Sequence, residues 1–298
     1  MNYNFSECRL CPRECKADRN ISVGFCGAPS EIRAARAALH FWEEPCISGT
    51  RGSGTVFFSG CSLRCVYCQN IEISGKNFGK AISVRRLAEI FEELQQNGAH
   101  NINLVTPTHY VPQIIEAIEI SKNRINIPFV YNTSGYETVE TIKMLKNYIS
   151  IYLADIKYFS SEYSKKYSAA PNYFEKASAA VHEMINQTGA PEFDENGMLK
   201  SGVIIRHMVI PSLRKDSICL LNELSKRFDK TDFILSLMRQ YTPNGNLENY
   251  PEINRRLTTF EYKSVVSEAV KLGFTNGYMQ EAESADRGFT PDFDLTGI

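Results

Sequence analysis

The chain has 298 residues, of which 43% are apolar and 22% charged, and this composition is ordinary for one large globular domain or a domain with a small appendage. The formal net charge of -1 excludes a sequence-wide electrostatic attraction for nucleic acid. No apolar run is long enough to span a membrane, and the first residues lack the pattern of a signal peptide, so we expect a cytoplasmic protein without nucleic-acid or membrane partners.

The first 45 residues carry four closely spaced cysteines. They follow the pattern Cys8-x2-Cys11-Pro12-x2-Cys15-x10-Cys26-Gly27. So short a segment has little core in which to bury four thiols, and a reducing compartment argues against disulfides, so we expect metal ligands. Four thiolates would complete either a structural zinc site or an auxiliary iron–sulfur cluster. We therefore predict a metal-binding segment with its connector, a helix or extended arm, over 1–45 and a larger domain over 46–298.

From about residue 55, short apolar runs alternate with amphipathic stretches. The predicted strands are Thr55–Phe58, Ile102–Thr106, Pro128–Asn132, Ser150–Asp155, Val203–Val209 and Phe233–Met238, with a shorter seventh at Thr275–Gln280. The predicted helices are one that follows the Ser83 cap and others over Pro112–Lys122, Glu137–Asn147, Asn172–Thr188, Lys215–Phe228 and Thr258–Leu272. Because the strands are almost wholly apolar, we expect a parallel sheet covered by helices.

Two irregular segments interrupt this alternation. Gly189–Gly202 contains the turn signal Asp194–Gly197, which predicts a hairpin. Tyr241–Arg256 is a long polar loop after the sixth strand. Loops of this length are often functional, so it is a candidate lid or substrate-recognition segment; a plain surface connection is the alternative.

The first predicted strand leads into a loop with three cysteines, spaced Cys61-x3-Cys65-x2-Cys68. A cubane iron–sulfur cluster has four irons, and three thiolates leave one iron open to an exogenous ligand. A cluster used only for electron transfer normally closes that site with another nearby cysteine. Zinc sites usually pair cysteines in two Cys-x2-Cys units. The spacing therefore predicts a catalytic iron–sulfur loop, with a zinc site or three incidental core cysteines as the alternatives.

This loop resembles that of the radical SAM superfamily, in which S-adenosylmethionine binds the open iron through its amino and carboxylate groups. The stretch Gly52–Asn70, GSGTVFFSGCSLRCVYCQN, is similar to the first strand and cluster loop of pyruvate formate-lyase activating enzymes. Nearly the whole chain resembles the activating-enzyme-like branch often labelled PflX. The resemblance implies an α/β fold, a partial, open (β/α)6 radical SAM barrel, with the small cysteine-rich segment at its N-terminus.

The same resemblance implies a radical SAM oxidoreductase. In this family an external one-electron donor, of flavodoxin or ferredoxin type, reduces a 4Fe-4S cluster. The cluster cleaves S-adenosylmethionine, and the resulting 5′-deoxyadenosyl radical takes a hydrogen atom from the substrate. In activating enzymes that atom comes from a glycine Cα of a glycyl radical enzyme. Radical modification of another peptide, a protein or a small metabolite is the alternative, and a non-enzymatic electron carrier or metal-binding scaffold is a third interpretation.

Further site residues are expected at the carboxyl ends of the strands. By the family pattern, Tyr67 packs near the adenine of S-adenosylmethionine, and it also covers the cluster. Relatives usually carry Gly-Gly-Glu after the second strand, whose backbone holds the amino group of the cofactor. This chain departs from that pattern: Thr106 and Thr108 could supply hydroxyl contacts there, and His109 is either a ligand-facing group or a structural histidine.

Charged residues follow two apolar runs. Asp155 and Lys157 alternate onto one face, where their burial is costly unless they meet each other or a ligand. They resemble the Asp-x-Lys of activating enzymes, in which the lysine meets the cofactor carboxylate; an internal salt bridge is the alternative. Arg206 resembles the arginine of the family's Arg-x-x-Val-Ile-Pro segment and suits a carboxylate or ribose contact. His207 has the opposite facing, so we expect Arg206 to line the cavity.

Overall fold

The computed structural model describes residues 3–245, 247–280 and 290–298. Its strands are β1 (Ile32–His40), β2 (Ser53–Phe58), β3 (Lys80–Ile82), β4 (Ile102–Val105), β5 (Phe129–Thr133), β6 (Ile151–Asp155), β7 (Glu192–Phe193), β8 (Leu199–Met208), β9 (Phe233–Met238) and β10 (Gly277–Met279). Its α-helices are α1 (Pro45–Ser48), α2 (Ile71–Ser74), α3 (Val84–Gln96), α4 (Val111–Ser121), α5 (Val139–Met144), α6 (Ser161–Ser168), α7 (Tyr173–Thr188), α8 (Arg214–Arg227) and α9 (Thr259–Lys271). Two short 3-10 helices are η1 (Phe5–Glu7) and η2 (Thr108–Tyr110).

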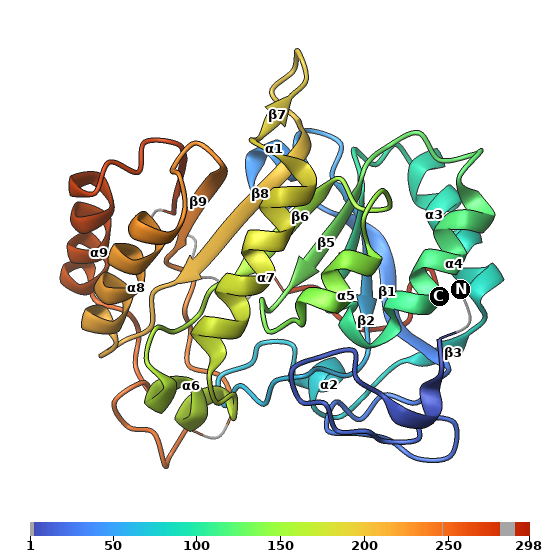
Figure 1. Ribbon diagram of the computed structural model, residues 1–298, viewed down its shortest axis with the longest axis horizontal. Coiled ribbons are helices and arrows are strands. Elements are labelled where there is room, and N and C mark those ends of the chain that lie inside the picture. Colours follow the sequence, from blue (N-terminus) through green and yellow to red (C-terminus); the bar gives the residue numbers. More distant parts are fainter. Residues whose placement is uncertain (1–2, 246, 281–289) are drawn as a thin grey trace.

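One mixed sheet organises the molecule, with the strand order β10-β9-β8-β6-β5-β4-β2-β1-β3. In this order, every pair of neighbouring strands between β2 and β10 is parallel. The six main predicted strands therefore lie side by side, and helices cover the outside of a partly open barrel (Figure 1). The predicted α/β fold is confirmed. The loops at the carboxyl ends of these strands gather at the lower edge of Figure 1, beside the cysteine-rich N-terminal segment.

Of the two alternatives predicted for the connector, a helix or an extended arm, the structure has the extended one. It forms β1, which pairs antiparallel with β2 on one side and with β3 on the other. Small buried residues, Ala34, Ala35 and Ala37, lie along this strand, so neighbouring chain packs closely against it. The C-terminal residues also bind β1, since the N–H of Ala37 donates to the carbonyl of Thr296 at 2.8 Å. The division of the chain at residue 45 stays a prediction.

Helix α3 shows how the sequence builds the outer layer. The Ser83 side chain accepts a hydrogen bond from the N–H of Arg86 and caps the helix. Its apolar residues recur at helical spacing and are buried, namely Leu87, Ile90, Phe91 and Leu94. Burial of each stabilises the fold by about 2 kcal/mol. None of the helices among the described residues combines the length and apolar character that crossing a membrane requires.

Candidate functional site

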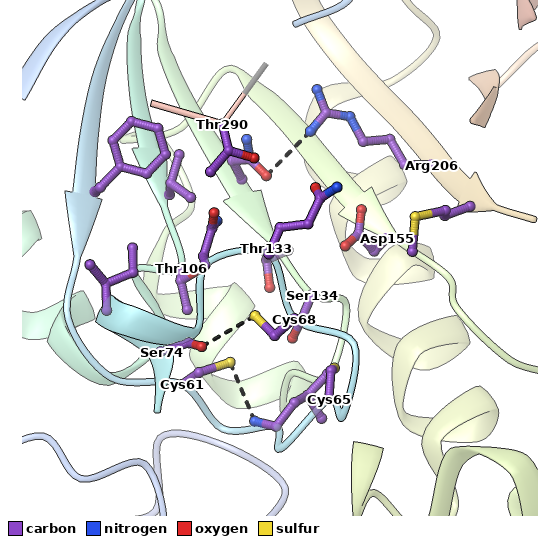
Figure 2. A pocket seen from close by; sticks show the side chains of 18 of the residues that line it. Cys61, Cys65, Cys68, Ser74, Thr106, Thr133, Ser134, Asp155, Arg206 and Thr290 are labelled. Carbon is purple, nitrogen blue, oxygen red and sulfur yellow. Dashed lines mark hydrogen bonds between the residues drawn. The ribbon is translucent and has the colours of Figure 1, made fainter. Parts of the chain in front are cut away.

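A cavity of about 270 Å³ lies at the carboxyl ends of the barrel strands. Figure 2 shows side chains from the cysteine loop and from the ends of β4, β5, β6 and β8 around it. Eight of the residues predicted from the sequence line this cavity: Cys61, Cys65, Tyr67, Cys68, Thr106, Asp155, Lys157 and Arg206. The lining does not include Thr108, His109 or the four N-terminal cysteines.

The cysteine loop is held by its backbone. Gly60, just before it, has φ +94, and a Cβ there would lie 2.9 Å from the carbonyl oxygen of Cys26, so the turn requires glycine. The N–H groups of Arg64 and Val66 donate to carbonyls in the last turn of α6, at 3.1 and 2.9 Å. These contacts fix the loop between the N-terminal segment and α6.

Each sulfur of the loop meets a hydrogen-bonding group. The N–H of Leu63 donates to Sγ of Cys61 at 3.4 Å, and the hydroxyl of Ser168 donates to Sγ of Cys65 at 3.0 Å. The hydroxyl of Ser74 lies 3.2 Å from Sγ of Cys68 (Figure 2). Hydrogen bonds to ligand sulfurs are characteristic of iron–sulfur sites, where they orient the ligands and tune the metal. This donor set suits thiolate ligands.

Burial raises the pKa of two thiols in the loop, that of Cys61 to about 12 and that of Cys65 to about 11. The positive charge of Lys157 opposes the rise at Cys65. Metal binding would displace these protons. Among the described residues no group of three or more His, Cys, Asp or Glu side chains is arranged around a single metal ion. The prediction for this loop is a cubane, in which each thiolate binds a different iron.

Asp155 and Lys157 are paired at the end of β6. Nζ of Lys157 donates to the Asp155 carboxylate, and both side chains line the cavity. Burial opposes the charge of Lys157, but the Asp155 carboxylate outweighs it and raises the pKa of the amine above its usual value. The internal salt bridge is therefore present, in a position that also faces the cavity.

Arg206 lines the cavity while its guanidinium is bound by two carboxylates that sequence analysis missed. Its Nε donates to Glu44 at 2.9 Å, and its Nη2 donates to both Glu43 and Glu44. With Asp155 and Lys157, the site holds three carboxylates and two cationic side chains.

The segment after β4 contributes only its first residue to the cavity. Thr106 lines it, with a φ of 57. The hydroxyl of Thr108 instead donates to the carboxylate of Glu137 at 2.6 Å, and Thr133 donates to the same oxygen. Burial raises the pKa of Glu137 to about 7, although these hydroxyls oppose the rise. Sequence analysis missed Glu137, which it placed in the first turn of a predicted helix.

His109 lies outside the cavity lining. Its Nε2 is 2.7 Å from the carbonyl oxygen of Ser59, an acceptor, so this nitrogen carries the hydrogen. Burial, together with the charge of Arg19, lowers the pKa of His109 to about 3, so the ring is neutral. Arg19 also donates to the carbonyl of His109 at 2.6 Å. The observed contacts are those of the structural alternative, a histidine that joins the N-terminal segment to the barrel.

The four N-terminal cysteines lie in a segment that packs on the cysteine loop. Cys8 and Cys26 are buried, Cys11 is partly buried and Cys15 is exposed. Burial raises the pKa of Cys11 to about 12, and neighbouring thiols, that of Cys26 first, add to the rise. The N–H of Cys61 donates to the carbonyl of Cys26 at 3.3 Å. One hydrogen bond therefore joins the two groups of cysteines.

Two comparisons settle the family. Residues 55–216 match the model of the radical SAM superfamily. An uncharacterised protein of Methanocaldococcus jannaschii is 31% identical over 277 residues, which cover 90% of this chain and 75% of that protein. The chain belongs to the radical SAM superfamily. It is therefore a radical SAM enzyme, of a family that uses a 4Fe-4S cluster and S-adenosylmethionine and requires an electron donor and a substrate.

Solved structures share the radical SAM fold at low identity. The FeFe-hydrogenase maturase HydG from Carboxydothermus hydrogenoformans has a TM-score of 0.51 and 13% identity, over 79% of this chain and 56% of its own. A variant of spore photoproduct lyase has a TM-score of 0.51 and 12% identity, over 74% of each chain. SuiB from Streptococcus suis, bound to the precursor peptide SuiA, has a TM-score of 0.50 and 14% identity, over 74% of this chain. The chain spans 46% of the length of SuiB.

Proposed function

We propose that Cys61, Cys65 and Cys68 bind the 4Fe-4S cluster and that the adjoining cavity binds S-adenosylmethionine. The observation that carries this proposal is the position of all three thiols in the lining of one cavity, each with a hydrogen-bonding group at its sulfur. When bound, the cluster and the cofactor supply a carbon radical that takes a hydrogen atom from the substrate.

The chain's own side chains have the remaining tasks in this proposal. Lys157 would offer its cation to the cofactor carboxylate, and Asp155, which is paired with it, would accept from the amino group. Tyr67 is buried in the lining, and there it would cover the cluster and pack near the adenine. Thr106 offers a hydroxyl at the position where relatives use backbone. Arg206 is paired with Glu43 and Glu44, and its Nη1 donates to Oδ1 of Asn132, another residue of the cavity lining, at 3.5 Å.

We propose that the chain belongs to the PflX-type branch and that its substrate is a polypeptide, specifically the glycine Cα–H of a glycyl radical enzyme, as in pyruvate formate-lyase activating enzymes. The support is the similarity of Gly52–Asn70 to activating enzymes and an exposed aromatic pair beside the cavity. Phe41 and Trp42 are 49% and 59% exposed, and Trp42 also lines the cavity. Aromatic side chains that combine exposure with contact to a cavity favour a large partner.

The test of the chemistry is cleavage of S-adenosylmethionine. After anaerobic reconstitution and reduction with dithionite, we expect 5′-deoxyadenosine from the wild type and from Cys219→Ala, whose thiol is exposed. The variant Cys61→Ala/Cys65→Ala/Cys68→Ala should form none. Equal product from the triple variant would remove these cysteines from the reaction.

The substrate needs a separate test. A glycyl radical enzyme deuterated at its glycine Cα should transfer deuterium into 5′-deoxyadenosine and acquire a glycyl radical in its electron paramagnetic resonance spectrum. Cleavage of S-adenosylmethionine without deuterium transfer would reject the activating role and favour the alternative, radical modification of another peptide, a protein or a small metabolite.

We also propose that Cys8, Cys11, Cys15 and Cys26 bind a second metal centre in a cytoplasmic protein, either zinc or an auxiliary iron–sulfur cluster. The support is the sequence spacing of the four cysteines and the effect of the neighbouring Cys26 and Cys8 thiols, which add to the rise in the pKa of Cys11. In the described residues no three of these side chains surround one ion, so metal binding would require them to turn toward one another. The iron or zinc that remains in the triple variant of the loop should equal the metal content of this second centre. A triple variant that binds no metal would contradict the proposal of a second centre. A flavodoxin or ferredoxin type of protein is the proposed electron donor.

A further inference from the structure

A buried chain of hydroxyl groups ends on one sulfur of the cysteine loop. The phenol oxygens of Tyr67 and Tyr158 are 2.5 Å apart, and the phenol of Tyr158 is 2.8 Å from Oγ of Ser168. The hydroxyl of Ser168 then donates to Sγ of Cys65 at 3.0 Å. Tyr67 is 5% exposed, and Tyr158 and Ser168 are fully buried. Three buried polar side chains are thus linked in series to one sulfur.

The direction of these hydrogen bonds follows from the thiolate. A metal-bound thiolate has no hydrogen, so Ser168 must donate its only hydrogen to Cys65. The oxygen of Ser168 therefore accepts from Tyr158, and the oxygen of Tyr158 accepts from Tyr67. All three dipoles point toward the sulfur, and in a buried chain each hydrogen bond strengthens the next.

The backbone holds Cys65 over this chain. The N–H groups of its two neighbours, Arg64 and Val66, donate to the carbonyls of Ser168 and Tyr167 at 3.1 and 2.9 Å. Ser168 is the last residue of α6, so the end of that helix binds the loop on both sides of Cys65. Two backbone hydrogen bonds and the hydroxyl of Ser168 therefore bind α6 to the loop around Cys65, and they fix the contact between the hydroxyl and the sulfur.

We propose that Ser168, polarised by Tyr158, is a positioning residue that raises the reduction potential of the 4Fe-4S cluster through Cys65. This inference rests on the proposed function of the cysteine loop. A donor at a ligand sulfur stabilises the more negative, reduced cluster, and hydrogen bonds to sulfur are among the factors that set the potentials of such clusters. The series of hydroxyl groups begins at Tyr67 in the cavity lining, so it also connects the cofactor cavity to the sulfur of Cys65.

The experiment compares four variants with the wild type by redox titration, monitored by electron paramagnetic resonance. Ser168→Ala should shift the midpoint potential of the cluster to a more negative value, because the donor is lost. Tyr158→Phe should shift it less in the same direction, because Ser168 then donates without its own donor. Ser168→Thr keeps the hydroxyl and should restore the wild-type potential.

The matched control is Ser164→Ala, which removes another buried hydroxyl of α6, one that donates to the carbonyl of Ser161 at 3.2 Å instead of to a sulfur. Its potential should equal that of the wild type. Resonance Raman spectra supply a second measurement. The iron–sulfur stretching bands should shift in Ser168→Ala and should keep their wild-type frequencies in Ser164→Ala.

Equal midpoint potentials in the wild type, Ser168→Ala and Tyr158→Phe would overturn the inference while leaving the proposed function intact. If Ser168→Ala loses its cluster, Tyr158→Phe decides, because it leaves every group that contacts the sulfur in place. A wild-type protein that binds no four-iron cluster at the loop would overturn both proposals, and iron analysis of the same samples separates these outcomes.

Discussion

Burial strongly shifts the pKa of one carboxyl group outside the cavity lining, that of Glu137. It is 1% exposed and accepts hydrogen bonds from Thr108 and Thr133. Burial raises its pKa from 4.5 to about 7, so the folded protein binds a proton that the unfolded chain releases. This contribution to stability is complete below pH 4.5 and is lost as the pH rises to about 7.

We therefore predict that Glu137→Gln becomes more stable relative to the wild type as the pH rises. The difference in unfolding free energy should change by up to about 1.4 kcal/mol per pH unit between the two pKa values and level off above the higher one. Urea denaturation of the metal-free proteins from pH 5 to pH 8 measures it. A difference that does not vary with pH would mean that Glu137 is ionised in the folded state throughout.

Single residues also mark the limit of prediction from sequence. Arg206 was expected in the cavity lining because it resembles the arginine of the family's Arg-x-x-Val-Ile-Pro segment and because His207 has the opposite facing. Its partners, Glu43 and Glu44, lie more than 160 positions earlier in the chain, in a connector with no periodic pattern. Contacts of that sequence separation depend on how the sheet closes, and no local pattern encodes them.

At the scale of elements, the parallel strands were predictable because strands covered on both sides are continuous apolar runs, whereas the antiparallel strands β1 and β3 were not predicted. Helix α6 was not predicted, because its eight residues, SEYSKKYS, are mostly polar and show no apolar period. It is nevertheless the helix that binds the cysteine loop. The hairpin predicted over 189–202 is present, since β7 pairs antiparallel with β8. The loop over 241–256 remains either a lid or substrate-recognition segment or a plain surface connection.

The turn that leads into the cysteine loop supports a second prediction. Gly60→Ala should lower the iron bound by the loop several-fold, because its Cβ would meet the carbonyl oxygen of Cys26 and push the loop from the N-terminal segment. Gly98→Ala is the control: its φ of +89 is similarly strained, but nothing lies within 4 Å of its added Cβ. Both variants should lose about 1 kcal/mol of stability from backbone strain. Equal iron content in the two would show that the clash is relieved without moving the loop.

At the scale of the whole molecule, three segments far apart in sequence meet at one edge of the barrel. The N-terminal segment, the cysteine loop and the residues after β4 are joined through Cys26, Cys61 and His109. The sequence predicted that the strand ends form the site, because the parallel order of the strands requires it. It did not predict that the N-terminal segment packs on the cysteine loop, because no pattern within the segment indicates which part of the fold it contacts.

Arg19 is one of the side chains that make this junction, together with Arg13, whose Nε donates to the carbonyl of Ser62 at 2.9 Å, and it supports the last prediction. Arg19 is 1% exposed, and its guanidinium donates to the carbonyls of Ala28, Pro29 and His109. Arg19→Met would leave these buried acceptors unpaired, at a cost of about 3 kcal/mol. The N-terminal segment should then detach before the barrel unfolds, and limited proteolysis should cut it at protease concentrations that spare the wild type.

The control for that experiment is Arg9→Met in the same segment. Arg9 pairs with Glu7 at the surface, and both side chains are about half exposed, so the pair should contribute almost nothing. Proteolysis of Arg9→Met should match the wild type. If Arg19→Met also matches it, the segment is held mainly by other contacts, of which the hydrogen bond from Cys61 to Cys26 is one. If Arg19→Met loses the segment and the iron of the loop together, the N-terminal segment and the cysteine loop fold as one unit.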